Sequence, residues 1–197
     1  MVLHQGVFDL NVVGPHRLVR AVFPHMAARR SGLIVNIGSV VGRTPTPWNA
    51  WYCAAKASLH SLTETLRSEA APFGIEVLLV APAAVQSNIS ANQAGQRGGD
   101  EAACILPDGS LYGDFVDRIV ARLYASQQQS HSMPTGVFTN IVADRMEKRS
   151  PGGFLTAGGG VIIFKILDLL PRWLTLWIMA KVWVRKGTKS ASLQGAL

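Results

Sequence analysis

The chain has 197 residues, of which 48% are hydrophobic and 16% are charged. This composition excludes an intrinsically disordered protein and predicts a single globular domain with a substantial core. Two cysteines and five scattered histidines show no disulfide or metal-ligand spacing, so we expect no metal and a reducing compartment, the cytoplasm. The N-terminus lacks the basic-then-apolar pattern of a signal peptide.

The net charge is +7, and most of the excess lies beyond Pro151, where six basic residues stand against Asp168 alone. The basic residues alternate with Trp, Leu and Ile instead of gathering on a polar surface: Lys165, Arg172, Lys181, Arg185, Lys186 and Lys189. This pattern argues against a nucleic-acid partner and favours an anionic membrane surface.

Residues 8–30 form the first predicted helix. Apolar side chains recur there at approximately helical spacing, away from the arginines: Leu10, Val13, Leu18, Ala21 and Val22. Gly32 is placed to end this helix. The apolar run at residues 33–37 is typical of a buried strand.

Residues 49–71 predict a second helix, and residues 75–80 predict a second buried strand. The expected inward face of this helix consists of Ala55, Leu59, Leu62 and Leu66. A strand, a helix and a strand of these lengths indicate a parallel βαβ unit with a right-handed crossover.

Ser39 lies just past the first strand, and Tyr52 and Lys56 share one face of the second helix because they are four residues apart. Free tyrosine has a pKa of about 10, and a lysine ammonium beside it is expected to shift that pKa downward. Ser39 can donate a hydrogen bond to the same substrate oxygen. The three side chains therefore suit proton transfer to a carbonyl oxygen. The alternative is an ordinary α/β core in which Ser39 and Tyr52 are buried and hydrogen-bonded.

Residues 90–129 are polar, with a helical stretch at 112–126, and residues 134–149 predict a further helix. Two apolar helices are expected at residues 161–170 and 173–184. Charges interrupt both, so neither reaches the roughly 18 uncharged residues that a membrane span needs. Trp173 and Trp177 share a helical face, as in an interfacial anchor. These helices either attach to a membrane surface or cover the sheet or an apolar substrate channel.

The motif N-x-G-S at residues 36–39, followed by Y-x-x-x-K at residues 52–56, resembles the short-chain dehydrogenase/reductase family. The resemblance implies hydride transfer between NADP or NAD and a ketone or secondary alcohol. Tyr52 would be the general acid, Lys56 would lower its pKa and bind the nicotinamide ribose, and Ser39 would polarise the carbonyl. Asn11 matches the family's N-x-x-G motif and would be the fourth catalytic residue, kinking its helix and holding a water. The alternative is an asparagine that only caps a helix or faces solvent.

The segment at residues 82–87 resembles the family's P-G-x-V-x-T turn, which holds the nicotinamide carboxamide. Val85 and Ser87 are therefore implied cofactor-binding residues. Ala83 replaces the glycine, which matters only if the backbone needs a positive φ there. The apolar tail resembles that of fungal acyl-dihydroxyacetone-phosphate reductases, and it suggests a lipid-like or polyketide-like, secondary-metabolite carbonyl substrate.

The family's glycine-rich turn, which places a pyrophosphate on a helix N-terminus, has no counterpart before Asn11. The glycines at 152–153 and 158–160 come late and follow no predicted strand. We therefore expect an α/β fold with a partial Rossmann-like, doubly wound parallel sheet that lacks the N-terminal βαβ units. A truncated catalytic domain would occupy residues 1–150, and C-terminal amphipathic helices would occupy residues 151–197.

Three interpretations remain open: a reductase of which this sequence is a part, a truncated and catalytically inactive relative that binds a protein partner, and a membrane-surface binding module. Family members commonly dimerise through the helices that correspond to residues 8–30 and 49–71, so a homodimer or heterodimer is expected. The endoplasmic reticulum or lipid droplets are the expected sites of peripheral membrane attachment.

Overall fold

The structure, a computed structural model, describes residues 2–87, 106, 109–126 and 131–184. Several features of the sequence lie outside these residues. They are Cys104, much of the polar segment at 90–129, and the last three basic residues, Arg185, Lys186 and Lys189.

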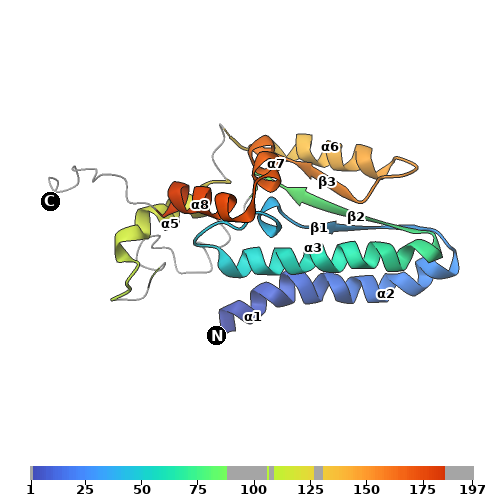
Figure 1. Ribbon diagram of the computed structural model, residues 1–197. Coiled ribbons are helices and arrows are strands. Elements are labelled where there is room, and N and C mark those ends of the chain that lie inside the picture. The colour runs from blue at the N-terminus through green and yellow to red at the C-terminus, as the bar shows by residue number, and fades with distance from the viewer. Residues whose placement is uncertain (1, 88–105, 107–108, 127–130, 185–197) are drawn as a thin grey trace.

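A three-stranded parallel sheet in the order β1-β2-β3 forms the centre of the molecule (Figure 1). β1 (Gly32–Ile37) and β2 (Ile75–Pro82) pair in register from Gly32↔Ile75 onward. Both strands are those that the sequence predicts. The α/β class and the parallel sheet are confirmed.

The third strand, β3 (Phe154–Ala157), is not predicted from the sequence because four residues are too few to show a strand pattern. The expectation that the glycines at 158–160 follow no strand is therefore wrong, since they come directly after β3. These glycines do not form an open phosphate loop. The amide of Gly159 donates to the carbonyl of Ala84 at 2.8 Å and its carbonyl accepts from the Ala84 amide at 3.2 Å, which ties this turn to the segment after β2.

Helices make up most of the remaining described chain, and each predicted helix is present with ends that differ by a few residues. In chain order they are α1 (Val2–Phe8), the π-helical turn η1 (Asp9–Val13), α2 (Gly14–Ala28), the 3-10 turn η2 (Val40–Gly42), α3 (Ala50–Ala70), η3 (Ala71–Phe73), η4 (Gly113–Phe115), α5 (Val116–Tyr124), α6 (Thr135–Met146), α7 (Val161–Leu169) and α8 (Arg172–Trp183).

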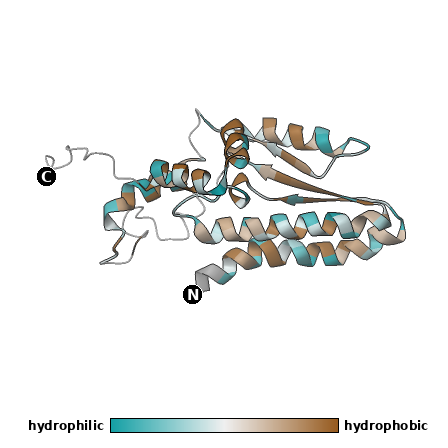
Figure 2. Cartoon of the chain, viewed as in Figure 1, coloured by the Kyte–Doolittle hydropathy of each residue, from teal (hydrophilic) through white to brown (hydrophobic). Residues whose placement is uncertain are grey.

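The sheet is covered on both faces, because alternate strand side chains point to opposite sides. On one face Ile34 and Val77 pack against α2 and α3, and on the other Leu78 and Leu155 pack against α6. Figure 1 shows the sheet between these two layers of helices. Burial on both faces explains why the strands are hydrophobic along their length, as Figure 2 shows.

The first helix contains a π-helical turn, η1, between α1 and α2. The expected apolar stripe does not face the core: Leu10 is 77% exposed and Leu18 is 70% exposed, whereas Val19 is buried. A π-helical turn inserts an extra residue into the helical repeat and rotates the residues that follow it. One 3.6-residue period therefore does not describe the whole of residues 8–30, and the sequence prediction of the buried face is wrong.

Candidate active site

Three segments meet at the edge of the sheet where the parallel strands end. Ser39 follows β1, Tyr52 lies near the start of α3, and Ala83 follows β2. Tyr52 and Ala83 pack against the same small core, formed by Val40, Val41 and Cys53. Ala83 is not among the described residues with a positive φ, so alanine replaces the family's glycine without backbone strain. The carboxyl ends of parallel strands are the usual position of a ligand site in an α/β sheet.

Ser39, Tyr52 and Lys56, which the sequence predicts as catalytic residues, lie together at this edge. The Ser39 hydroxyl lies close enough to Tyr52 to act on its pKa, which this interaction lowers. The Nζ of Lys56 donates to the carbonyl oxygen of Ile37 at 2.8 Å and lies 5.6 Å from the centroid of the Tyr52 ring. The hydroxyl pair and the ammonium therefore form one buried polar cluster.

The electrostatics of Tyr52 differ from the sequence expectation. Burial raises the pKa of Tyr52, and this effect exceeds the lowering by the Ser39 hydroxyl and by the positive charge of Arg122. Burial also lowers the pKa of Lys56. The expected net downward shift of the Tyr52 pKa is wrong for this structure. Tyr52 is therefore a phenol at neutral pH, the protonation state that a proton donor requires.

Asn11 lies in η1, and its Nδ2 donates to the carbonyl oxygen of Val7 at 2.9 Å. Asn11 and Lys56 line the same open groove of about 390 Å³ beside β1. The helix deviates from regular α geometry at the position where the resemblance to the family implies a kink. The structure thus brings Asn11 to the same groove as Lys56, although its amide group bonds within its own helix.

Val85 and Ser87 follow β2 and form the outer part of this edge. Val85 pairs with Met133 in a parallel bridge. The bonds of this bridge are made by the carbonyl of Ala84 and the amide of Gln86, each at 3.0 Å, so the amide and carbonyl of Val85 point away from Met133. Ser87 is exposed.

His60 is a residue of this site that the sequence analysis missed. Its Nε2 accepts a hydrogen bond from the backbone amide of Ser39 at 3.2 Å, and its ring packs so closely on Gly38 that a Cβ there would collide with it. Burial lowers the pKa of His60, so the ring is neutral. Tyr52, Lys56 and His60 follow one another at intervals of four residues, and this shared helical face is the signal that could have identified His60.

No group of three or more His, Cys, Asp or Glu side chains in the described part of the chain could hold a metal ion. The polar groups at the strand ends are instead a hydroxyl pair and an ammonium. This donor set suits hydrogen bonding to a carbonyl or hydroxyl oxygen.

Residues 3–98 match the family model of the short chain dehydrogenases. The chain is 34% identical over 171 residues to the short-chain dehydrogenase virD of Hypocrea virens, covering 87% of this chain and 55% of virD. It is 40% identical over 106 residues to an NADPH-dependent 1-acyldihydroxyacetone phosphate reductase of Schizosaccharomyces pombe, covering 54% of this chain and 34% of that protein.

The fold is similar to the crystal structure of a short-chain dehydrogenase from Streptomyces avermitilis, with a TM-score of 0.67 and 30% identity over 91% of this chain and 62% of that one. The chain thus spans little more than half the length of virD and under two thirds of the Streptomyces enzyme. The sequence similarity and the shared fold agree with the motifs at the strand ends, and the chain belongs to the short-chain dehydrogenase/reductase family.

Proposed function

We propose that this chain carries the catalytic residues of an NAD(P)H-dependent oxidoreductase that reduces a ketone or oxidises a secondary alcohol. The observation that supports this most strongly is the placement of the Lys56 ammonium, 2.8 Å from the Ile37 carbonyl oxygen at the end of β1 and 5.6 Å from the centroid of the Tyr52 ring, with Ser39 close by. NADPH or NADH, when bound, would supply the hydride.

Tyr52 acts as the general acid in reduction. Its raised pKa keeps the phenol protonated until a carbonyl oxygen gains negative charge and accepts the proton. Ser39 orients that oxygen through a hydrogen bond. Lys56 stabilises the phenolate that remains, and Asn11 supports the return of a proton through the groove that it shares with Lys56.

The residues at the strand ends fit the nicotinamide end of the cofactor. An ammonium has three N–H donors and the carbonyl of Ile37 takes one, so Lys56 retains donors for the nicotinamide ribose. The amide and carbonyl of Val85, which point away from Met133, fit the carboxamide of the nicotinamide. Ser87 lies two residues further along the chain and offers a hydroxyl. The name of the Schizosaccharomyces relative supports NADPH as the cofactor and a lipid-like carbonyl compound as the substrate.

A titration with NADPH and NADH, followed by tryptophan fluorescence, tests the proposal. Trp48 and Trp51 lie on either side of the Asn49 cap of α3 and close to Tyr52 in sequence, so they should respond to an occupied site. Saturable binding that Lys56→Met weakens is the expected result. A folded chain that binds neither nucleotide would contradict the proposal and favour the alternative, an inactive relative that pairs with another protein through α2 and α3.

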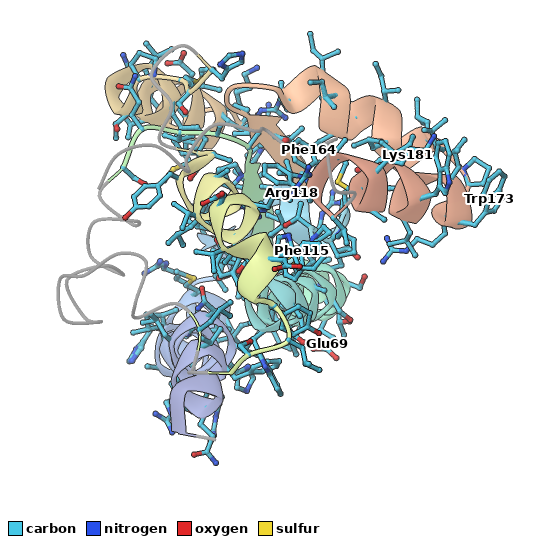
Figure 3. The ribbon with its side chains drawn as sticks, turned by 90° about the vertical axis from the view of Figure 1, so that its left-hand side faces the viewer. Glu69, Phe115, Arg118, Phe164, Trp173 and Lys181 are labelled. Atoms are coloured by element: carbon cyan, nitrogen blue, oxygen red, sulfur yellow. The ribbon has the colours of Figure 1, made fainter. Side chains whose placement is uncertain are left out.

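We also propose that α7 and α8 attach to an anionic membrane surface. Leu169 is 86% exposed and Trp173 is 69% exposed, and Figure 3 shows Trp173 and Lys181 on the outer side of this helix pair. Lys165 and Arg172 add positive charge beside them. No helix among the described residues is both long enough and apolar enough to cross a bilayer.

Flotation with anionic and neutral vesicles tests this attachment. Binding should require anionic lipid and should fall when Leu169 and Trp173 are both replaced by alanine. Equal recovery with both kinds of vesicle, or an unaffected double variant, would contradict it.

A further inference from the structure

Aromatic side chains from three distant segments gather next to the loop that leads into Tyr52. The ring of Trp48 lies 5.5 Å from the rings of Tyr112 and Phe115, measured between centroids, and its Nε1 donates to the carbonyl oxygen of Trp183 at 3.1 Å. Tyr112 and Phe115 directly precede α5, and Trp183 is the last residue of α8. Figure 1 shows both helices at the end of the sheet toward which β2 points. In Figure 3, which views that end, α5 and Phe115 lie in front of the sheet.

Trp48 has a φ of 66°, a conformation that costs a non-glycine residue free energy and that persists only where its surroundings hold it. Trp48 is held by the rings of Tyr112 and Phe115, which precede α5, and by the carbonyl of Trp183 at the end of α8. The aromatic residues therefore form a wall on the loop that leads into the helix of Tyr52.

Arg122 of α5 reaches into this wall. Its Nε and Nη2 donate to the hydroxyl oxygen of Thr46 at 3.0 and 2.5 Å, and its guanidinium lies 5.6 Å from the centroid of the Trp183 ring. Among the described residues the only ion pair is Arg43 with Asp168, so no carboxylate there neutralises Arg122. A partly buried guanidinium that no carboxylate of the described residues neutralises has a desolvation cost that a bound anion would offset.

The guanidinium also lies close to the catalytic group. The hydroxyl of Thr46, which accepts from Arg122, lies 3.8 Å from the Sγ of Cys53, the residue next to Tyr52. Burial raises the pKa of Tyr52, and the positive charge of Arg122 acts in the opposite direction, as the smallest of the effects on that pKa. A ligand with its carbonyl at Tyr52 would therefore lie within reach of the segment that Arg122 contacts.

We propose that Arg122 and the wall of Trp48, Tyr112, Phe115 and Trp183 form the substrate site, and that this site takes a carbonyl compound with an anionic group, a carboxylate or a phosphate, attached to an apolar or aromatic body. This proposal rests on the proposed function, because it places the reacting carbonyl at Tyr52. The guanidinium has five N–H donors in a planar fork, and among the described residues Thr46 accepts from two of them, so the fork offers further donors that suit an anion with geometric selectivity.

The test compares aryl ketones that share an acetylphenyl body and differ in the group at the para position, anionic or neutral. The quenching of tryptophan fluorescence would report the binding of 4-acetylbenzoate, 4-acetylphenyl phosphate and the neutral 4-acetylbenzamide, because Trp48 and Trp183 line the site. The wild type should bind at least one of the two anions about tenfold to hundredfold more tightly than the amide, the factor expected for a charge-assisted hydrogen bond. The anion with the larger preference identifies the group as a carboxylate or a phosphate.

Arg122→Gln should abolish the preference for the anion, while Arg17→Gln, which removes an exposed charge from α2, should retain it. Equal binding of anion and amide by the wild type, or a preference that survives in Arg122→Gln, would overturn the proposal. The readout does not depend on turnover. An anion preference without any carbonyl-dependent oxidation of NADPH would therefore refute the proposed function and leave the anion site standing.

Discussion

Replacing His60 tests how α3 holds Ser39, the proposed carbonyl-orienting residue, in place. The Nε2 of His60 accepts the backbone amide of Ser39 at 3.2 Å, and the other ring nitrogen, Nδ1, is buried with no hydrogen-bond partner among the described residues. A neutral ring that accepts at Nε2 carries its proton at Nδ1. Glutamine can keep an acceptor near the position of Nε2 without a titratable group, whereas leucine fills a similar volume and removes the acceptor.

The expected magnitudes follow from this contact. His60→Leu leaves the partly buried amide of Ser39 without this acceptor, which should lower the free energy of unfolding by about 1–3 kcal/mol. His60→Gln should cost much less at pH 8, because the acceptor remains.

The pH dependence has a defined sign. Burial lowers the pKa of His60 below its usual value of 6.5 and is the largest effect on it. Of the surrounding charges, Glu64 and Asp168 raise this pKa, and Arg43 and Lys56 lower it. The stability that the neutral ring contributes is fully present above the unfolded-state pKa and is lost as the pH falls through the folded-state pKa.

Urea unfolding at about pH 8 and about pH 5 measures both effects. Between these conditions the wild type should lose more stability than His60→Gln, and His25→Gln, an exposed substitution on α2, should follow the wild type. A His60→Leu variant as stable as the wild type at pH 8, or parallel pH profiles for the wild type and His60→Gln, would refute the reasoning.

Two further predictions concern the core that supports the site. Thr63→Val should lower the free energy of unfolding by about 1–3 kcal/mol, because the Nδ2 of Asn36 donates to the buried Thr63 hydroxyl at 3.0 Å. Thr63→Ser keeps a hydroxyl and should therefore retain most of the wild-type stability. Equal urea midpoints for the two variants would contradict this. Leu78→Ala should cost about 2–5 kcal/mol, since this side chain is fully buried between β2 and α6. Leu111→Ala, at a position 95% exposed, should change stability by less than about 0.5 kcal/mol, and a comparable loss there would show that burial does not set the cost.

Local spacing made the central residues of the site predictable. Ser39 follows a strand that an apolar run reveals, and Tyr52 and Lys56 occupy one face of a long helix, so both elements and their meeting point could be derived from the sequence. The sign of the Tyr52 pKa shift could not be derived from the sequence, because burial is a tertiary property and here it outweighs the nearby charges.

The features that sequence analysis missed depend on contacts between distant segments. Arg122 reaches Thr46 across 76 residues, and neither position carries a local signal for the contact. β3 is too short to show a strand period and becomes a strand only through its pairing with β2. The π-helical turn η1 shifted the buried face of the first helix in the same unforeseen way.

The most direct test of the central claim is the carbonyl-dependent loss of NADPH absorbance, measured for the wild type and for Tyr52→Phe. Removing the phenolic hydroxyl removes the proposed proton donor but keeps the ring that packs on Val40 and Val41, so the variant should fold normally by circular dichroism. We expect turnover in the wild type and none in Tyr52→Phe. Unchanged turnover in a folded Tyr52→Phe variant would contradict the assignment of Tyr52 as the general acid.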